Sequence, residues 1–281
     1  MTTTARQVVL PSGETFAALG QGTWHFAEHP AGRADEIAAI RLGLDLGMTT
    51  VDTAEMYGDG ASETLVGEAI SGRRDEVFLV DKVLPNHATR AGTGRACRAS
   101  LARLNTDHID LYLLHWRGNV PLAETVEGFE DLVKEGLIRY WGVSNLDLDD
   151  MGELTGSPGG DQVQANQILY NLTRRGPEYD LIPWLSERGI PMMAYSPIEQ
   201  GRLLGHPALD EVARRHSATS AQIALAWVLR HDGVSAIPRA STSAHVRENA
   251  AAVQINLGPE DLSVLDRAFP PPTGPRRLET L

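Results

Sequence analysis

Short apolar runs rich in β-branched residues alternate with amphipathic segments along the whole chain. Eight such runs are long enough to be strands, at 16–20, 49–52, 77–82, 109–115, 140–144, 162–166, 192–195 and 235–238. Each run is largely apolar, as a parallel strand that is covered on both faces should be. Repeated strand and helix units of this kind predict a parallel sheet with helices packed against it.

Amphipathic segments between the runs predict the helices. They cover 34–46, 63–70, 93–104, 122–135, 147–154, 181–187, 220–230 and 245–253, and residues 207–216 predict an additional helix between the last two strands. Four of the segments are followed by Gly47, Gly136, Gly189 or Gly233. Glycine readily takes the left-handed conformation that ends a helix, so these positions support the predicted boundaries.

The number of repeats separates a closed barrel from an open sheet. Eight repeats in 281 residues predict an α/β protein with one closed (β/α)8 TIM barrel, a fold that typically needs about 250 residues. An open Rossmann sheet is the alternative, but no G-x-G-x-x-G motif follows the first run. Residues 7–18 predict a hairpin that closes the barrel floor. We expect a single domain over 1–281, with its core at about 16–255 and an irregular C-terminal tail at 270–281.

Charge and composition exclude several classes of function. The chain has 25 basic and 37 acidic residues, a net charge of −12, and this sign disfavours nucleic acid and anionic membranes as partners. The N-terminal segment has no apolar signal region and no apolar stretch is long enough to span a bilayer, so we expect a cytoplasmic protein. The histidines and the lone Cys97 show no metal-binding spacing, and no G-x-S-x-G motif of a hydrolase is present. We therefore predict no metal.

Chemically active side chains occur at the predicted carboxyl ends of the strands, where a (β/α)8 barrel has its active site. Asp52 ends the second run and Tyr57 follows it, Lys82 ends the third, and His115 ends the fourth. One such residue alone would most often make a structural hydrogen bond. Four of them at the ends of three consecutive strands indicate a catalytic group.

These four residues suit the protonation of an oxyanion. A lysine cation next to Tyr57 should lower the pKa of the tyrosine from its usual value of about 10. Asp52 is the anion that would keep a half-buried Lys82 protonated. His115 can donate a hydrogen bond to a carbonyl oxygen and hold it near the Tyr57 hydroxyl.

Several further motifs occur in order at the strand ends and carry a resemblance to a known family. Besides D-T-A-x-x-Y at 52–57, they are G-V-S-N at 142–145, Q-x-x-Y-N at 167–171, Y-S-P at 195–197, and I-P-R at 237–239 with Glu248 and Asn249. From about residue 20 to residue 249, the chain resembles the aldo-keto reductases. It resembles most the bacterial members that reduce small aldehydes such as methylglyoxal.

The resemblance implies a nicotinamide cofactor bound across the barrel mouth and hydride transfer to a carbonyl group, with Tyr57 as general acid. Asp52, Tyr57, Lys82 and His115 would be the catalytic residues, and Trp24 and Trp116 would form an aromatic wall around a small carbonyl substrate. The residues that would bind the cofactor are Gly22, Thr23, Ser144, Asn145, Gln167, Tyr195, Ser196, Gln200, Gly201, Arg202, Leu203, Arg239, Ala240, Ser241, His245, Glu248 and Asn249.

Parts of the cofactor site have more specific expectations. Ser144, Asn145 and Gln167 would hydrogen-bond the carboxamide, and Tyr195 would stack on the nicotinamide ring. Residues 196–203 would carry the pyrophosphate, with Arg202 as a charge partner, and residues 239–249 would face the adenosine.

The residues at the adenosine end bear on the choice between NADPH and NADH. Many family members have serine and arginine where this chain has Ala240 and His245. Arg239 keeps one fixed charge for a 2′-phosphate, whereas His245 is mostly neutral near pH 7 at its usual pKa of about 6.5. We predict a modest preference for NADPH, with NADH as the alternative.

Two other classes of function compete with a reductase. One is a lyase in which Lys82 forms a Schiff base, although a charged lysine next to Asp52 lacks the free amine that this chemistry needs. The other is a regulatory barrel protein that binds the nicotinamide cofactor and turns over only incidentally. The resemblance implies a monomer. The physiological substrate would be set by the loops after strands one, four and seven and by the C-terminal tail.

Overall fold

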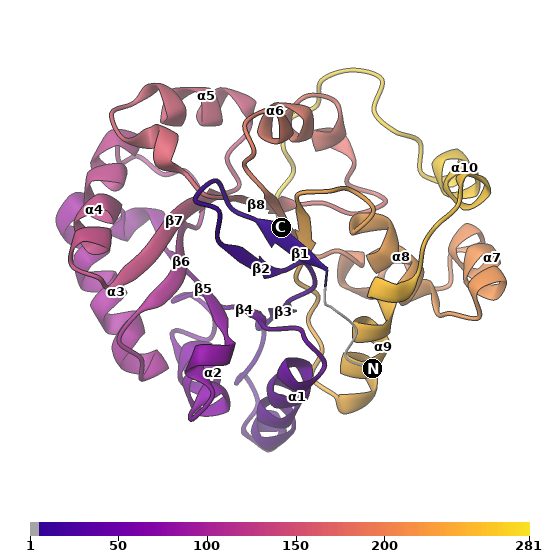
Figure 1. Ribbon diagram of the computed structural model, residues 1–281, viewed down its shortest axis with the longest axis horizontal. Coiled ribbons are helices and arrows are strands. Elements are labelled where there is room, and N and C mark those ends of the chain that lie inside the picture. Colours follow the sequence, from indigo (N-terminus) through magenta and orange to yellow (C-terminus); the bar gives the residue numbers. More distant parts are fainter. Residues whose placement is uncertain (1–5) are drawn as a thin grey trace.

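The computed structural model describes residues 6–281. Residues 1–5, which are part of the N-terminal segment predicted to contain no signal region, lie outside the described residues. Within the described part, parallel strands β3 to β10 form an eight-stranded sheet in sequence order, surrounded by helices (Figure 1). The strands are β3 (Gln21–Gly22), β4 (Thr50–Asp52), β5 (Phe78–Val83), β6 (Ile109–Leu114), β7 (Ile138–Ser144), β8 (Asn166–Leu169), β9 (Met192–Tyr195) and β10 (Val234–Ala236).

Backbone hydrogen bonds between the first and last strand segments close this sheet. The amide of Gly20 donates to the carbonyl of Ala236 over 2.8 Å, and the Ala236 amide donates to Ala18 over 2.8 Å. The Gly22 amide continues the pairing at the Pro238 carbonyl, 3.1 Å away. The predicted (β/α)8 barrel is therefore confirmed.

Helices follow the strands close to their predicted positions. They are α1 (Arg33–Asp45), α2 (Ala61–Ile70), α3 (Arg90–Leu104), α4 (Leu122–Lys134), α5 (Leu148–Gly156), α6 (Leu181–Glu187), α7 (Pro207–His216), α8 (Ser220–Val228), α9 (Ser243–Ala251) and α10 (Pro259–Ala268). Single 3-10 turns are η1 (Pro30–Gly32), η2 (Arg74–Glu76), η3 (Pro85–His87), η4 (Gly160–Gln162), η5 (Gly176–Glu178), η6 (Glu199–Gly201) and η7 (Ala252–Gln254). Gly47 and Gly136 have φ values of +87° and +73°, as the predicted helix ends require.

The first predicted strand, 16–20, is only partly right, because residues 15–17 belong to the floor of the barrel, whereas Leu19 pairs in parallel with Ala236 of β10. They form β2 (Thr15–Ala17), which pairs antiparallel with β1 (Gln7–Val9) in the predicted hairpin. The Phe16 side chain is buried and stacks on Phe78 with ring centroids 5.1 Å apart. The apolar run thus covers the lower end of the barrel, and the barrel strand itself begins later, at Gln21.

Two other boundaries differ from the sequence prediction. The strand expected at 162–166 is β8 at Asn166–Leu169, because the 3-10 turn η4 still occupies the chain up to Gln162. Helix α10 was not predicted, although Pro259 at its first turn, followed by Glu260 and Asp261, is a typical helix start.

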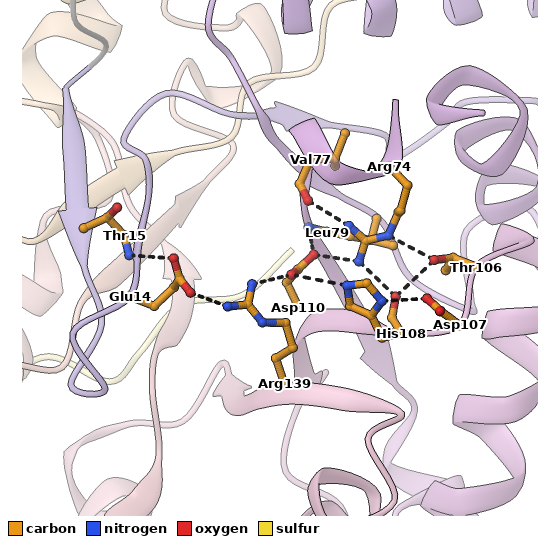
Figure 2. A network of polar contacts seen from close by, with 10 residues as sticks. All are labelled: Glu14, Thr15, Arg74, Val77, Leu79, Thr106, Asp107, His108, Asp110 and Arg139. Atoms are coloured by element: carbon orange, nitrogen blue, oxygen red, sulfur yellow. Dashed lines mark hydrogen bonds and ion pairs between the residues drawn. The ribbon is translucent and has the colours of Figure 1, made fainter. Parts of the chain in front are cut away.

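A network of polar contacts at the amino ends of the strands ties the hairpin to the barrel (Figure 2). Asp110 of β6 is buried and accepts hydrogen bonds from Arg74 Nη2 at 2.7 Å, from the Leu79 amide at 2.9 Å and from Arg139 Nη1 at 2.9 Å. Arg139 also pairs with Glu14, just before β2. One carboxylate therefore joins β5, β6, β7 and the floor, at the end of the barrel opposite the strand carboxyl termini.

Candidate active site

The four predicted catalytic side chains meet at the carboxyl ends of β4, β5 and β6. Lys82 Nζ, fully buried on β5, donates to Asp52 Oδ2 at 2.8 Å and to the Thr53 carbonyl at 2.8 Å. The same nitrogen lies 3.3 Å from the Tyr57 hydroxyl. Tyr57 reaches this position from the turn after β4, where its amide donates to the Ala54 carbonyl.

His115 completes the group directly after β6. Its ring meets Tyr57 edge to face, with centroids 5.9 Å apart and planes at 77°. Its Nδ1 atom is buried and has no hydrogen-bond partner among residues 6–281. Burial, helped by the charge of Lys82, lowers the pKa of His115 to about 2. The imidazole is therefore neutral and carries one N–H donor.

The electrostatics of the lysine–tyrosine pair differ from the sequence prediction. Burial raises the pKa of Tyr57 and outweighs the opposing effect of Lys82, so the predicted lowering is wrong. Burial also disfavours the Lys82 cation, but Asp52 and Tyr57 more than offset this and raise the lysine pKa. Lys82 is therefore an ammonium group next to a protonated tyrosine. A Schiff-base role, which needs a neutral amine, does not fit this environment.

A cavity of about 840 Å³ opens above these residues, a size within the usual range for a bound cofactor or small ligand. It brings together most of the residues predicted from the sequence. Those that line it are Gly22, Trp24, Asp52, Tyr57, His115, Trp116, Ser144, Asn145, Gln167, Tyr195, Ser196, Gln200, Gly201 and Arg239.

The predicted carboxamide ligands form one hydrogen-bonded chain beside the catalytic group. Gln167 Nε2 donates to Asp52 Oδ1 at 2.7 Å, and Ser144 Oγ donates to the Gln167 carbonyl at 2.8 Å. Asn145 Nδ2 donates to the His115 carbonyl, and Asn145 Oδ1 accepts from the Tyr195 hydroxyl at 2.8 Å. The Tyr195 ring is thereby held in one orientation at the cavity wall, as a stacking platform requires.

Three predicted cofactor residues have other contacts. Thr23 is fully buried, and its hydroxyl donates to the Asp52 carbonyl and accepts from Ser62. Leu203 is buried in the hydrophobic core. Arg202 donates to Glu199 at 2.9 Å. None of the three side chains lines the cavity. Thr23 and Leu203 support the site from behind, and the exposed Arg202 is paired with Glu199 through its Nη2 atom.

The predicted adenosine residues lie just before α9 or on it and do not line the cavity: Ala240, Ser241, His245, Glu248 and Asn249. His245 is exposed, Asn249 is buried, and Glu248 accepts a hydrogen bond from the Thr219 hydroxyl. Arg239 stands at the cavity edge, where its guanidinium group lies over the Phe26 ring and 3.9 Å from Glu36. It is the fixed positive charge that the sequence predicted there.

Sequence reasoning missed several residues of the cavity wall, among them Met56, Arg117, Thr280 and Leu281. The Met56 side chain is exposed at the mouth of the cavity. Met56 and Arg117 are the sequence neighbours of the predicted Tyr57 and Trp116, so their place in the cavity wall could have been predicted from these neighbours. Thr280 and Leu281 belong to the C-terminal tail, which the sequence predicted to shape the substrate end without pointing to these two residues.

Comparison with known proteins agrees with this geometry. The model of the aldo/keto reductase family matches residues 18–269. The chain belongs to this family. A methylglyoxal reductase of Escherichia coli K12, YeaE, is 51% identical over 267 residues, covering 93% of this chain and 94% of the relative.

Two further relatives bear on the cofactor. A crystal structure of a Klebsiella pneumoniae aldo/keto reductase in complex with NADP and acetate has a TM-score of 0.97 and 50% identity, covering 99% of this chain and all of that one. An Escherichia coli protein named NADH-specific methylglyoxal reductase is 29% identical, covering 89% of this chain and 94% of its own length.

Residues 6–281 contain neither a metal-binding cluster nor a membrane-spanning helix. No cluster of three or more histidine, cysteine, aspartate or glutamate residues there could hold a metal ion. No helix in this range is long and apolar enough to cross a bilayer.

Proposed function

We propose that this enzyme uses NADPH to reduce a small aldehyde or ketone, such as a 2-oxoaldehyde of the methylglyoxal type, to the alcohol. The observation that carries this proposal is the buried contact of Lys82 with Asp52 and Tyr57 at the base of the cavity. The names of the Escherichia coli relatives support the substrate class. The exposed Trp24 and Trp116 side chains at the mouth offer aromatic walls for a small carbonyl compound.

The chain's residues fit a nicotinamide dinucleotide. Tyr195 offers an aromatic face, Asn145 and Gln167 offer amide groups, and Arg239 offers a fixed charge at the cavity edge. In our proposal, Gly22 and residues 196, 200 and 201 line the path of the cofactor. When bound, the cofactor supplies the hydride.

The protein supplies the proton and the orientation of the carbonyl group. The Tyr57 hydroxyl, kept protonated by burial, donates its proton to the carbonyl oxygen as negative charge develops there. Lys82 then stabilises the tyrosinate across the 3.3 Å contact. Asp52 holds the lysine in place, and the neutral His115 directs its N–H at the same oxygen.

A panel of carbonyl compounds tests the reaction class and the substrate. We expect NADPH oxidation, followed by its absorbance, with methylglyoxal and other short aldehydes, and lower kcat/KM with bulky aromatic aldehydes. NADPH binding without turnover of any carbonyl compound would instead support the regulatory alternative.

The location of the protein in the cytoplasm and its monomeric state stay predictions. Light scattering would measure the oligomeric state.

Cofactor preference depends on Arg239 in this proposal. NADPH should be preferred modestly over NADH, because Arg239 is the one fixed charge among the predicted adenosine residues that lies at the cavity edge. Arg239→Met should lower kcat/KM for NADPH by about tenfold, the loss of one charge-assisted hydrogen bond, and leave kcat/KM for NADH nearly unchanged. Equal losses with both cofactors would show that Arg239 does not serve the 2′-phosphate.

A further inference from the structure

The chain after α10 returns to the mouth of the barrel. Residues 270–281 form no helix or strand, and in Figure 1 this yellow segment loops past α6 towards the barrel axis. Residues 275–278 and the start of α6 line a smaller cavity of about 410 Å³. Thr280 and Leu281 line the large cavity itself, so the tail covers part of the candidate active site.

Arg174 holds this tail to a second segment of the mouth. It lies in a tight turn after β8, where its amide donates to the Asn171 carbonyl at 2.9 Å. Its Nη1 atom is 2.5 Å from Glu279 Oε1 on the tail, and its Nη2 atom is 2.9 Å from Glu199 Oε1 in the loop after β9. One guanidinium group therefore bridges two segments that are 80 residues apart in the chain.

Glu199 in turn sets the shape of the loop that lines the other side of the cavity. Its carboxylate is only 5% exposed and also accepts from Asn171 Nδ2 at 2.7 Å and from Arg202 at 2.9 Å. Glu199 and Gln200 have φ values of +50° and +55°, a conformation that non-glycine residues keep only where their surroundings enforce it. Asn171 adds a bond to the Ser196 carbonyl at 2.9 Å, so the loop at 196–202 depends on the Arg174–Asn171 turn.

We propose that Arg174 is a positioning residue that couples closure of the tail to the conformation of the loop at 196–202. This inference rests on the proposed function, in which that loop carries the cofactor's phosphates. Cofactor binding that orders the loop would fix the position of Glu199. Glu199 would then hold Arg174 in place, and Arg174 would hold Glu279 and thus keep the tail over the substrate end of the cavity. Because coupling between sites is reciprocal, loosening the tail must also weaken cofactor binding.

A double-mutant cycle tests the reciprocal effect. The dissociation constant of NADPH is measured by quenching of tryptophan fluorescence in the wild type, Glu279→Gln, Arg174→Met and the double variant. We expect Glu279→Gln to weaken NADPH binding by about two- to fivefold although Glu279 lies on the tail, and to have no further effect beside Arg174→Met. Glu187→Gln, which removes an exposed carboxylate elsewhere, is the matched control and should change nothing.

A cysteine label tests closure of the tail directly. Leu278 is half-buried and lines the smaller cavity, which contains none of the predicted cofactor residues, so we do not expect bound NADPH to shield it directly. The native Cys97 gives little background, because it is fully buried and burial raises its pKa to about 12. In Leu278→Cys, NADPH should slow the reaction with a disulfide reagent such as DTNB by about fivefold or more. Adding Arg174→Met should speed the reaction of the free protein and remove most of the NADPH effect.

The outcomes separate this inference from the proposed function. If NADPH binds but does not slow the thiol reaction, or if the effects of Glu279→Gln and Arg174→Met on binding are additive, the coupling is wrong while the reductase proposal stands. If NADPH does not bind the wild type at all, the proposed function fails and the coupling fails with it. A normal dissociation constant in Glu279→Gln also contradicts the coupling, and this measurement does not depend on the cysteine variant.

Discussion

At the scale of single residues, burial decides the chemistry of the candidate site more than neighbouring charge does. The sequence correctly placed Lys82 beside Tyr57, and from that proximity it predicted a lowered tyrosine pKa. In the structure Lys82 is fully buried and Tyr57 lies half-buried at the base of the cavity, and burial raises the pKa of Tyr57 in spite of the lysine. The depth of a side chain depends on the whole fold, so the direction of this shift could not be read from the motif.

The same reasoning predicts the pH dependence of the reaction. His115 has its pKa lowered to about 2, so the folded protein keeps it neutral at every higher pH, and Tyr57, with its pKa raised, keeps its proton. We therefore expect kcat/KM for a neutral aldehyde to stay within about twofold from about pH 6 to pH 9. An ionisation near pH 6.5 that disappears in His115→Gln would show that the histidine titrates during the reaction.

At the scale of strands and helices, the sequence predicted the elements that carry the chemistry better than those that close the barrel. Asp52 ends β4, Lys82 is the second-last residue of β5, and His115 directly follows β6. Each of them stands at the end of a largely apolar run, which makes the end visible in the sequence. The run containing Phe16 is equally apolar but serves the floor. Periodicity reports burial and not the strand that a segment pairs with, so the sequence assigned residues 16–18 both to the floor hairpin, which is confirmed, and to the first barrel strand.

The floor network gives a stability prediction at this scale. Asp110→Asn removes the carboxylate shared by Arg74 and Arg139. Because both arginines keep some contact with water, the free energy of unfolding should fall by about 2–3 kcal/mol, at or below the lower end for a broken buried ion pair. For a chain of this size the melting temperature should fall by roughly 3–5 °C. Scanning calorimetry measures the change.

A matched variant shows whether the loss of stability in Asp110→Asn comes from the burial of the Asp110 carboxylate. Asp45→Asn breaks the more exposed pair with Arg73 and should cost less than about 0.5 kcal/mol. Because Asp110 lies at the amino ends of the strands, its variant should keep the wild-type kcat below its melting temperature. Equal losses of stability in the two variants would contradict the structural role of the floor network.

At the scale of the whole molecule, net charge and motif spacing give only part of the site. A charge of −12 describes the surface, whereas the cavity edge carries Arg239 and the mouth is held by Arg174 between two glutamates. The tail that supplies Thr280 and Leu281 comes from the other end of the chain and matches no motif. Its place depends on contacts with α6 and Arg174 that only the assembled barrel creates.

In the proposed reaction Tyr57 gives the proton, and the variant Tyr57→Phe tests this role. Tyr57→Phe keeps the ring that meets His115 and removes only the hydroxyl next to Lys82. We measure NADPH oxidation with methylglyoxal together with NADPH binding by fluorescence. We expect kcat to fall by about 100-fold or more, which is the loss in rate expected when a general acid is removed. The dissociation constant of NADPH should stay within about twofold of the wild-type value. A variant that binds NADPH normally and keeps most of its turnover would show that Tyr57 is not the proton donor.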